Sequence, residues 1–87
     1  MDLEWDEEKR RKNLQERGLD FADVDKFVPS TVRTRPDTRK DYGEPRFNSI
    51  GDLDGALCTF CWTPRGGKIR VISLRKANAR ERKTYQD

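Results

Sequence analysis

The sequence contains no histidine among its 87 residues, so it lacks the side chain that most often transfers protons near neutral pH. Any catalysis must therefore use aspartate, glutamate, arginine, lysine or tyrosine. These side chains permit proton transfer by a carboxylate and charge neutralisation by guanidinium groups.

A long apolar run is also missing. The longest run is far shorter than the roughly 18 residues that indicate a membrane-spanning helix. Met1 is followed directly by Asp2-Leu3-Glu4, which is not the pattern of a secretory signal peptide. We therefore expect a cytoplasmic protein that has no membrane partner.

Cysteine is scarce, and Cys58 and Cys61 form a C-x-x-C pattern. Residues three apart in a strand point to opposite faces, so these thiols could neither form a disulfide nor share a metal ion without a bend. A zinc site would lack its other ligands, and a thioredoxin-like motif would need a helix where this chain has Trp62-Thr63-Pro64. We expect buried thiols that pack as small apolar side chains, and neither a metal site nor a cofactor.

The chain is short and highly charged. Its length predicts a single domain, residues 1–87, with a thin core, because a chain of this size buries only about 60% of its unfolded surface. Hydrophobic residues make up 32% of the sequence and charged residues 40%. The apolar residues are nevertheless concentrated in strand-like runs such as 56–63 and 69–72, which indicates a folded domain rather than a disordered one.

Turn and cap signals divide the chain into helices and strands. A short strand at residues 3–5 precedes a helix at 7–17, which Asp6 begins and Gly18 ends. A second, shorter helix begins at Asp20, with Phe21, Val24 and Val28 on one face. Strands are expected at residues 31–35, 46–53, 56–63 and 68–74, and a terminal helix from residue 78. These elements predict an α+β fold, a small antiparallel meander sheet with two N-terminal helices and one C-terminal helix.

The charges are distributed unevenly. Residues 1–28 hold nine acidic and six basic residues, a net charge of −3, whereas residues 29–87 hold seven acidic and thirteen basic residues, a net charge of +6. In the basic half, carboxylates and arginines surround Gly43 in the segment 37–46, and a second basic stretch runs from residue 68 to 83. Together they indicate an anion-binding surface, and a phosphate is the natural ligand. The alternative is a solubilising surface with local ion pairs.

A set of short fragments extends in order along essentially the whole chain. They are Trp5-Asp6-Glu7 with Lys9 and Asn13, Gly18, Phe21, Asp37-x-Arg39-x-x-Tyr42-Gly43-Glu44-x-Arg46, Gly51, Thr63-x-Arg65, and Arg70-x-Ile72-Ser73-x-Arg75-Lys76-Ala77-x-x-x-Glu81-x-x-x-Tyr85. Each fragment alone is weak, but in order and spacing the set resembles the BrnT family of bacterial toxins.

The resemblance implies a RelE-like ribonuclease fold, RNA cleavage that arrests translation and growth, and neutralisation in a type II toxin-antitoxin system. The implied partner is a BrnA-like antitoxin with a ribbon-helix-helix part. The complex would contact operator DNA only through this part of the antitoxin. Three positions depart from the family pattern: Arg17 stands where a histidine is common, Val28 where an aspartate often follows the phenylalanine, and Leu74 where alanine is usual. The exchange at Arg17 removes any proton transfer by that histidine.

RNA cleavage without a metal ion requires a base for the 2′-hydroxyl proton, cations for the phosphoryl oxygens and an acid for the departing 5′ oxygen. Glu44 is the candidate base, because it lies beside a glycine turn and between Tyr42 and Arg46. The predicted phosphate-stabilising pair is Arg46 and Arg70. The remaining predicted RNA-binding residues are Arg65 and Arg75 for the backbone, Arg39 in an assisting role, and Lys9 or Tyr85 as acid or as ligand of a flanking phosphate.

Each assignment has a structural alternative. Glu44 could instead form an ion pair with Arg46 or Arg75 that staples adjacent strands. Tyr42 and Trp62 could stack on bases, although a tryptophan in such a strand more often belongs to the core. The alternative function is a basic binding module, catalytically weak or inactive, for a nucleic acid or an acidic protein.

Overall fold

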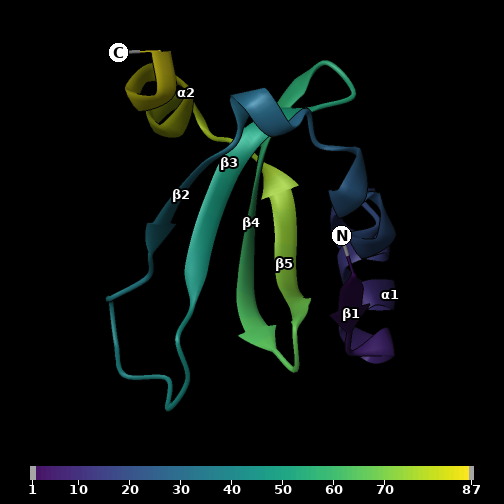
Figure 1. Ribbon diagram of the computed structural model, residues 1–87. Helices are drawn as coiled ribbons and strands as arrows, with labels where there is room; N and C mark the ends of the chain where they lie inside the picture. The colour runs from purple at the N-terminus through teal and green to yellow at the C-terminus, as the bar shows by residue number, and fades with distance from the viewer. Residues whose placement is uncertain (1, 87) are drawn as a thin grey trace.

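The computed structural model describes residues 2–86 and contains a five-stranded sheet with helices at its margins (Figure 1). In chain order the elements are β1 (Leu3–Trp5), α1 (Glu7–Arg17), the 3-10 helices η1 (Phe21–Lys26) and η2 (Pro29–Thr31), β2 (Arg33–Pro36), β3 (Phe47–Leu53), β4 (Ala56–Arg65), β5 (Lys68–Lys76) and α2 (Ala79–Gln86). The α+β class is therefore confirmed. Within residues 2–86 no helix combines the length and apolar character needed to span a lipid bilayer.

The sheet has the strand order β1-β5-β4-β3-β2. Strands β2 to β5 form the predicted antiparallel meander. The expectation of an entirely antiparallel sheet is wrong, because β1 pairs with β5 in parallel and Glu4 lies opposite Arg70. Short turns force consecutive strands to be antiparallel, but β1 reaches β5 only after a long crossover, which permits parallel pairing.

The first helix is confirmed with the predicted bounds. The Asp6 side chain accepts hydrogen bonds from the backbone N–H groups of Glu8 and Lys9, and Gly18 ends the helix in the left-handed conformation at φ 70°. At the other end of the chain, Asn78 and Glu81 form the predicted reciprocal capping box, since each side chain accepts the other residue's backbone N–H.

The prediction of a second N-terminal α-helix is wrong. This segment forms the two short 3-10 helices η1 and η2, because Pro29 lacks a backbone N–H and disfavours a helical conformation at the preceding residue. Phe21 and Val24 are buried as predicted, but Val28 is 43% exposed and Phe27 is buried in its place. The next strand consequently begins at Arg33 rather than at residue 31.

The hydrophobic core lies between η1 and one face of the sheet. It consists of Phe21, Val24, Phe27, Leu53, Cys58, Phe60, Val71 and Leu74. Pairing of Phe60 with Leu74 places both on this face, so the flanking pair Thr59 and Arg75 belongs to the opposite face. The opposite face carries the candidate site.

A β-bulge interrupts the pairing of β4 with β5. Cys61 pairs with Ser73 and Trp62 pairs with Val71, which leaves Ile72 as the extra residue. Nearby, the Asn13 side chain of α1 accepts a hydrogen bond from the backbone N–H of Leu74 and donates one to the carbonyl of Leu19. Asn13 thus fixes α1 against the bulged strand.

Both cysteines are free. Cys58 is buried in the core and Cys61 is half-buried, so the predicted burial is confirmed fully only for Cys58. Burial raises the pKa of both thiols. Trp62 packs on Phe47 at 4.9 Å between ring centroids and donates its indole N–H to Ser49, as a structural tryptophan does.

Candidate functional site

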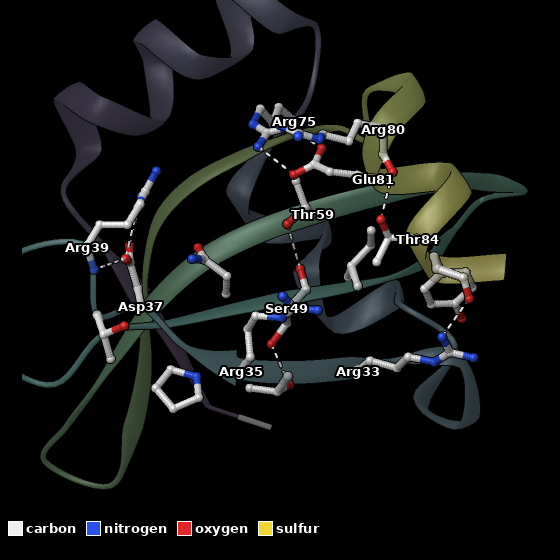
Figure 2. Close-up of a pocket in the computed structure, with 16 residues that line it drawn as sticks. Arg33, Arg35, Asp37, Arg39, Ser49, Thr59, Arg75, Arg80, Glu81 and Thr84 are labelled. Atoms are coloured by element: carbon white, nitrogen blue, oxygen red, sulfur yellow. Dashed lines mark hydrogen bonds and ion pairs between the residues drawn. The ribbon is translucent and has the colours of Figure 1, made fainter. Parts of the chain in front are cut away.

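A hollow of about 490 Å³ lies between α2 and the sheet face opposite the core. Figure 2 shows its side chains converging from β2, β3, β4, β5 and α2. We call it the arginine groove, because five arginines line it: Arg33, Arg35, Arg39, Arg75 and Arg80. Its lining carboxylates, Asp37 and Glu81, are fewer than its arginines, so the groove favours an anionic ligand.

Strand register builds the floor of the arginine groove. Arg33 lies opposite Ile50, Ile50 opposite Thr59, and Thr59 opposite Arg75. Residues directly opposite each other on neighbouring strands share a face. Arg33 on β2 and Arg75 on β5 are the outermost residues of this row. They therefore lie on one surface although they are far apart in the sequence.

Arg75 is held by α2. Its Nη1 and Nη2 atoms donate to the two carboxylate oxygens of Glu81 at 2.7 and 2.9 Å. These hydrogen bonds raise the pKa of Arg75, whereas the positive charge of Arg39 acts in the opposite direction. The same bonds lower the pKa of Glu81 despite its partial burial. Both Arg75 and Arg39 line the groove, so their positive charges are available to the same anionic ligand.

Arg39 is held in a similar way from the loop between β2 and β3. Its Nε and Nη2 atoms donate to Asp37 at 2.9 and 2.8 Å. These bonds hold the pKa of the Asp37 carboxyl well below its usual range. The arginine groove therefore contains two guanidinium groups, those of Arg39 and Arg75, that carboxylates of the same chain orient.

Tyr85 anchors α2 to the sheet. Its hydroxyl donates to the carbonyl of Thr31 at 2.5 Å, and the Arg33 guanidinium carbon lies 4.2 Å from its ring centroid. Arg33 also donates to the Tyr85 carbonyl at 2.6 Å. Tyr85 therefore lines the arginine groove, but its hydroxyl is engaged with the backbone rather than free for a phosphate.

A second hollow of about 410 Å³ adjoins the arginine groove. We call it the loop hollow, because residues 36–38, 40–42 and 44–47 line it. The two hollows share residues 36–38. The loop hollow contains two predicted catalytic residues, Glu44 and Arg46.

Glu44 and Arg46 form an ion pair at 3.4 Å, with the Glu44 side chain 43% exposed. The Arg46 guanidinium carbon lies 4.0 Å from the ring centroid of Tyr42, and the Lys40 ammonium lies 5.2 Å from the same centroid. Thr63 ties this part of the loop to β4 by donating to the Pro45 carbonyl at 2.5 Å. A solvent-accessible carboxylate thus lies beside the Arg46 guanidinium group.

The structure does not bring every predicted site residue to these hollows. Arg70 donates to Glu4 of β1 at 2.6 Å, and Arg65 lies exposed at the end of β4. Lys9 lies on the exposed surface of α1. None of these three residues lines the arginine groove or the loop hollow.

Three arginines of the groove were missed by the sequence analysis: Arg33, Arg35 and Arg80. The first two are separated by one residue in an expected strand, and that period of two places both on one face. This signal was available in the sequence. Arg80 belongs to the basic stretch at residues 68–83, where it could form a solvated helix face or a backbone-binding rim, because no local pattern shows which side of a terminal helix faces the sheet.

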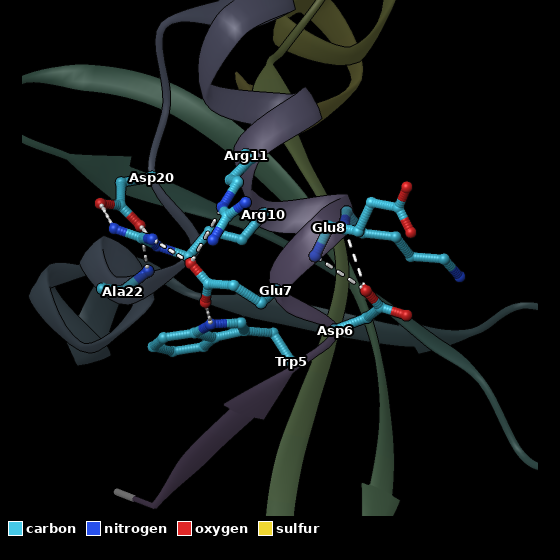
Figure 3. A network of polar contacts seen from close by, with 9 residues as sticks. Trp5, Asp6, Glu7, Glu8, Arg10, Arg11, Asp20 and Ala22 are labelled. Atoms are coloured by element: carbon cyan, nitrogen blue, oxygen red, sulfur yellow. Dashed lines mark hydrogen bonds and ion pairs between the residues drawn. The ribbon is translucent and has the colours of Figure 1, made fainter.

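A separate charged network joins β1, α1 and η1 (Figure 3). Arg10 donates to both carboxylate oxygens of Asp20 at 2.8 and 2.9 Å and to Glu7 at 2.5 Å. The Trp5 indole N–H donates to Glu7 at 3.1 Å. Asp20 also accepts the backbone N–H of Ala22, so this network has a structural role in fixing η1 against α1.

Two comparisons with known proteins bear on this site. The family model for BrnT, the ribonuclease toxin of type II toxin-antitoxin systems, matches residues 5–81. A search of curated proteins found no matching relative. The matched span includes the floor of the arginine groove, the loop hollow and the first residues of α2.

Proposed function

This chain belongs to the BrnT family of ribonuclease toxins of type II toxin-antitoxin systems, and we propose that it cleaves RNA without a metal ion where the arginine groove meets the loop hollow. Family membership makes it a ribonuclease toxin with an antitoxin protein as its partner. The metal independence, the position of the reaction and the residue roles are our proposal.

One observation carries the proposal: Arg39 from the loop after β2 and Arg75 from β5 line the same groove, and each is oriented by a carboxylate. A phosphodiester bound between them would meet preorganised donors for the charge that develops on its nonbridging oxygens. Such donors stabilise a transition state without reorganising during the reaction. The floor of the groove adds Arg35 for a neighbouring phosphate.

In the proposed reaction, Glu44 accepts the proton of the 2′-hydroxyl and the 2′ oxygen attacks the adjacent phosphorus. The bond from phosphorus to the 5′ oxygen then breaks, which leaves a 2′,3′-cyclic phosphate and a 5′-hydroxyl. Lys40, which lines the same hollow, is our candidate for protonating the departing oxygen. Arg46 is positioned beside Glu44 and would stabilise the phosphoryl oxygens.

Arg70, Arg65 and Lys9 have no part in this mechanism. Arg70 joins β5 to β1 through its hydrogen bond to Glu4, and Arg65 and Lys9 lie outside both hollows. The hydroxyl of Tyr85 would have to leave the Thr31 carbonyl before it could donate a proton to RNA. We therefore assign Tyr85 to holding α2 in place.

The proposal of metal independence rests on the composition of the site. Two-metal nucleases hold cations about 4 Å apart with several carboxylates. Here Asp37, Glu44 and Glu81 each pair with an arginine, and local guanidinium charge opposes binding of a cation.

We further propose that the antitoxin is BrnA-like, with a ribbon-helix-helix part through which the complex binds operator DNA. A partner that binds the folded toxin stabilises it by mass action. Titration with such an antitoxin should raise the melting temperature of the toxin. An unchanged melting temperature at excess partner would reject this assignment.

Product analysis of a defined RNA tests the cleavage mechanism. The expected products carry 2′,3′-cyclic phosphate and 5′-hydroxyl ends, EDTA has no effect, and a single 2′-deoxy substitution at the cut site abolishes cleavage while RNA binding is retained. Inhibition by EDTA that added magnesium reverses, or cleavage of the deoxy substrate, would contradict the mechanism. RNA binding without cleavage would favour the alternative of a basic binding module.

A further inference from the structure

Asp37 is a buried carboxylate directly after β2, where the chain leaves the sheet and enters the loop that carries Glu44 and Arg46. Its side chain is 1% exposed, whereas the side chain of its partner Arg39 is 76% exposed. Burial of a carboxylate is costly unless hydrogen bonds and an opposite charge compensate it. The Asp37 carboxylate therefore requires partners that compensate its burial.

All the side-chain partners of Asp37 come from the same loop. Its carboxylate accepts hydrogen bonds from Arg39 Nε at 2.9 Å, Arg39 Nη2 at 2.8 Å and the Arg39 backbone N–H at 3.2 Å. It also accepts the Tyr42 hydroxyl at 3.3 Å. The backbone N–H of Asp37 donates to the carbonyl of Arg46 at 2.8 Å and so joins the two ends of the loop.

The loop has few other restraints. Residues 37–46 contain neither a helix nor a strand. Among the described residues, one side chain of the sheet forms a hydrogen bond with this loop: Thr63 donates to the Pro45 carbonyl. The arrangement of Arg39 and Tyr42 therefore depends on Asp37.

We propose that Asp37 is the positioning residue of the site, which holds Arg39 and Tyr42 so that Arg39 meets the phosphate and the Tyr42 ring supports Arg46. This inference rests on the proposed RNA cleavage. Asp37 acts through its neighbours, because its buried carboxylate cannot reach the RNA. Arg46 lies 4.0 Å from the Tyr42 ring centroid, so displacement of Tyr42 would also move the cation beside Glu44.

The ionisation of Asp37 agrees with a fixed acceptor. The hydrogen bonds from Arg39 lower the pKa of Asp37, whereas burial acts in the opposite direction. The lowered pKa favours the charged form of the Asp37 carboxylate near neutral pH. This carboxylate orients the guanidinium group and does not carry a proton.

Single-turnover and steady-state cleavage by Asp37→Asn tests this role. We expect kcat to fall at least tenfold and KM to change less than threefold, because RNA still meets the arginines but the geometry is lost. Asp54→Asn is the matched control, since it makes the same exchange in the exposed turn between β3 and β4. A wild-type kcat in Asp37→Asn would overturn the proposal.

A double-mutant cycle separates positioning from a general loss of structure. Arg39→Gln should lower kcat at least tenfold, and its melting temperature should also fall, because the buried Asp37 carboxylate loses the charge that compensates it. Asp37→Asn added to Arg39→Gln should then cost less than threefold more. Full activity of Arg39→Gln would overturn the role even if Asp37→Asn alone is unfolded. If Asp37→Asn is folded, effects of the two substitutions on kcat that simply multiply would also overturn it.

The Nε–H resonance of Arg39 gives a readout that does not require cleavage. In wild type it should be protected from solvent exchange and should shift when a 2′-deoxy RNA oligonucleotide binds, and Asp37→Asn should abolish its protection. Protection without any RNA cleavage would reject the proposed function and retain Asp37 as the residue that positions Arg39. An unprotected Nε–H in an active wild-type enzyme would reject the role of Asp37 and leave the proposed function intact.

Discussion

Arg75 and Glu81 form a bidentate ion pair that joins the end of β5 to α2 at the margin of the arginine groove. Arg75, which would bind a phosphate in the groove, is thus already bound to the Glu81 carboxylate of the same chain. Both side chains are partly exposed, at 38% and 30%. RNA must therefore share Arg75 with Glu81 or displace it.

Glu81→Gln should strengthen RNA binding, because it removes a negative charge from the groove and retains a hydrogen-bond acceptor. One unit charge at close range in water corresponds to about 1 kcal/mol, so the dissociation constant should fall about fivefold. Fluorescence anisotropy with a non-cleavable RNA measures it. Glu16→Gln makes the same charge change on the exposed surface of α1, and an equal effect of both variants would show that net charge alone is responsible.

Acid should destabilise the fold through its paired carboxylates. Hydrogen bonds from Arg10 lower the pKa of Asp20 from 3.8, and hydrogen bonds from Arg75 lower the pKa of Glu81 from 4.5. A depressed pKa contributes stability that is fully present above the unfolded value and is lost as the pH falls through the folded value. The free energy of unfolding should therefore be nearly constant above pH 5 and should decline below about pH 4.5.

Urea unfolding at a series of pH values measures that decline. Asp20→Asn should lower stability near neutral pH and make the decline at acid pH shallower, because one titrating group has been removed. Asp25→Asn, at an exposed position of η1, is the control and should follow the wild-type curve. A wild-type acid response in Asp20→Asn would contradict the role of its pairing with Arg10.

The salt dependence of RNA binding should distinguish the groove from the rest of the basic surface. Each phosphate contact to a single strand contributes about 0.7 to the slope of log affinity against log salt concentration. Arg35→Ala and Arg75→Ala should each make the slope shallower by about 0.7. Arg65→Ala removes the same charge outside both hollows and should leave the slope unchanged. If Arg65→Ala changed the slope as much as Arg75→Ala, RNA would bind elsewhere on the basic surface.

Asn13 provides a test of how α1 is fixed to the bulged strand. Asn13→Ala would leave the backbone N–H of Leu74 and the carbonyl of Leu19 without their partner. An unsatisfied buried polar group costs about 1–3 kcal/mol, so the melting temperature should fall by roughly 4–8 °C for each kcal/mol. Gln15→Ala on the exposed face of the same helix should change stability by less than about 0.5 kcal/mol.

Local signals in the sequence predicted most of the secondary structure. Asp6 and Gly18 defined α1, and Asp54-Gly55 defined the turn between β3 and β4, where both residues have positive φ at 51° and 83°. These features depend on neighbouring residues, so a linear pattern reveals them. The parallel pairing of β1 with β5 depends on contacts between the two ends of the chain, and no local pattern encodes it.

The candidate site was predictable only where it is local. Glu44 and Arg46 are neighbours in one loop, and the structure places them side by side. The spacing of Arg33 and Arg35 could have revealed a basic strand face, but not that α2 covers it. The ion pair of Arg70 with Glu4 could not be predicted, because it joins β5 to a strand at the other end of the sequence.

Glu44 is the residue on which the proposed chemistry depends most directly. Its carboxylate is accessible to solvent and lies 3.4 Å from Arg46, an arrangement that serves both a general base and a surface ion pair. A surface ion pair contributes only about 0–1 kcal/mol to stability, whereas loss of a general base lowers the rate by about 100-fold to 10,000-fold. Glu44→Gln should therefore lower kcat within that range while the melting temperature changes by only a few degrees and RNA binding is retained or strengthened.

Measurements of cleavage and of thermal unfolding on the same variants, with Glu16→Gln as the matched control, separate the role of general base from that of surface ion pair. A wild-type kcat in Glu44→Gln would assign this carboxylate to orienting Arg46 and would require another base for the 2′-hydroxyl.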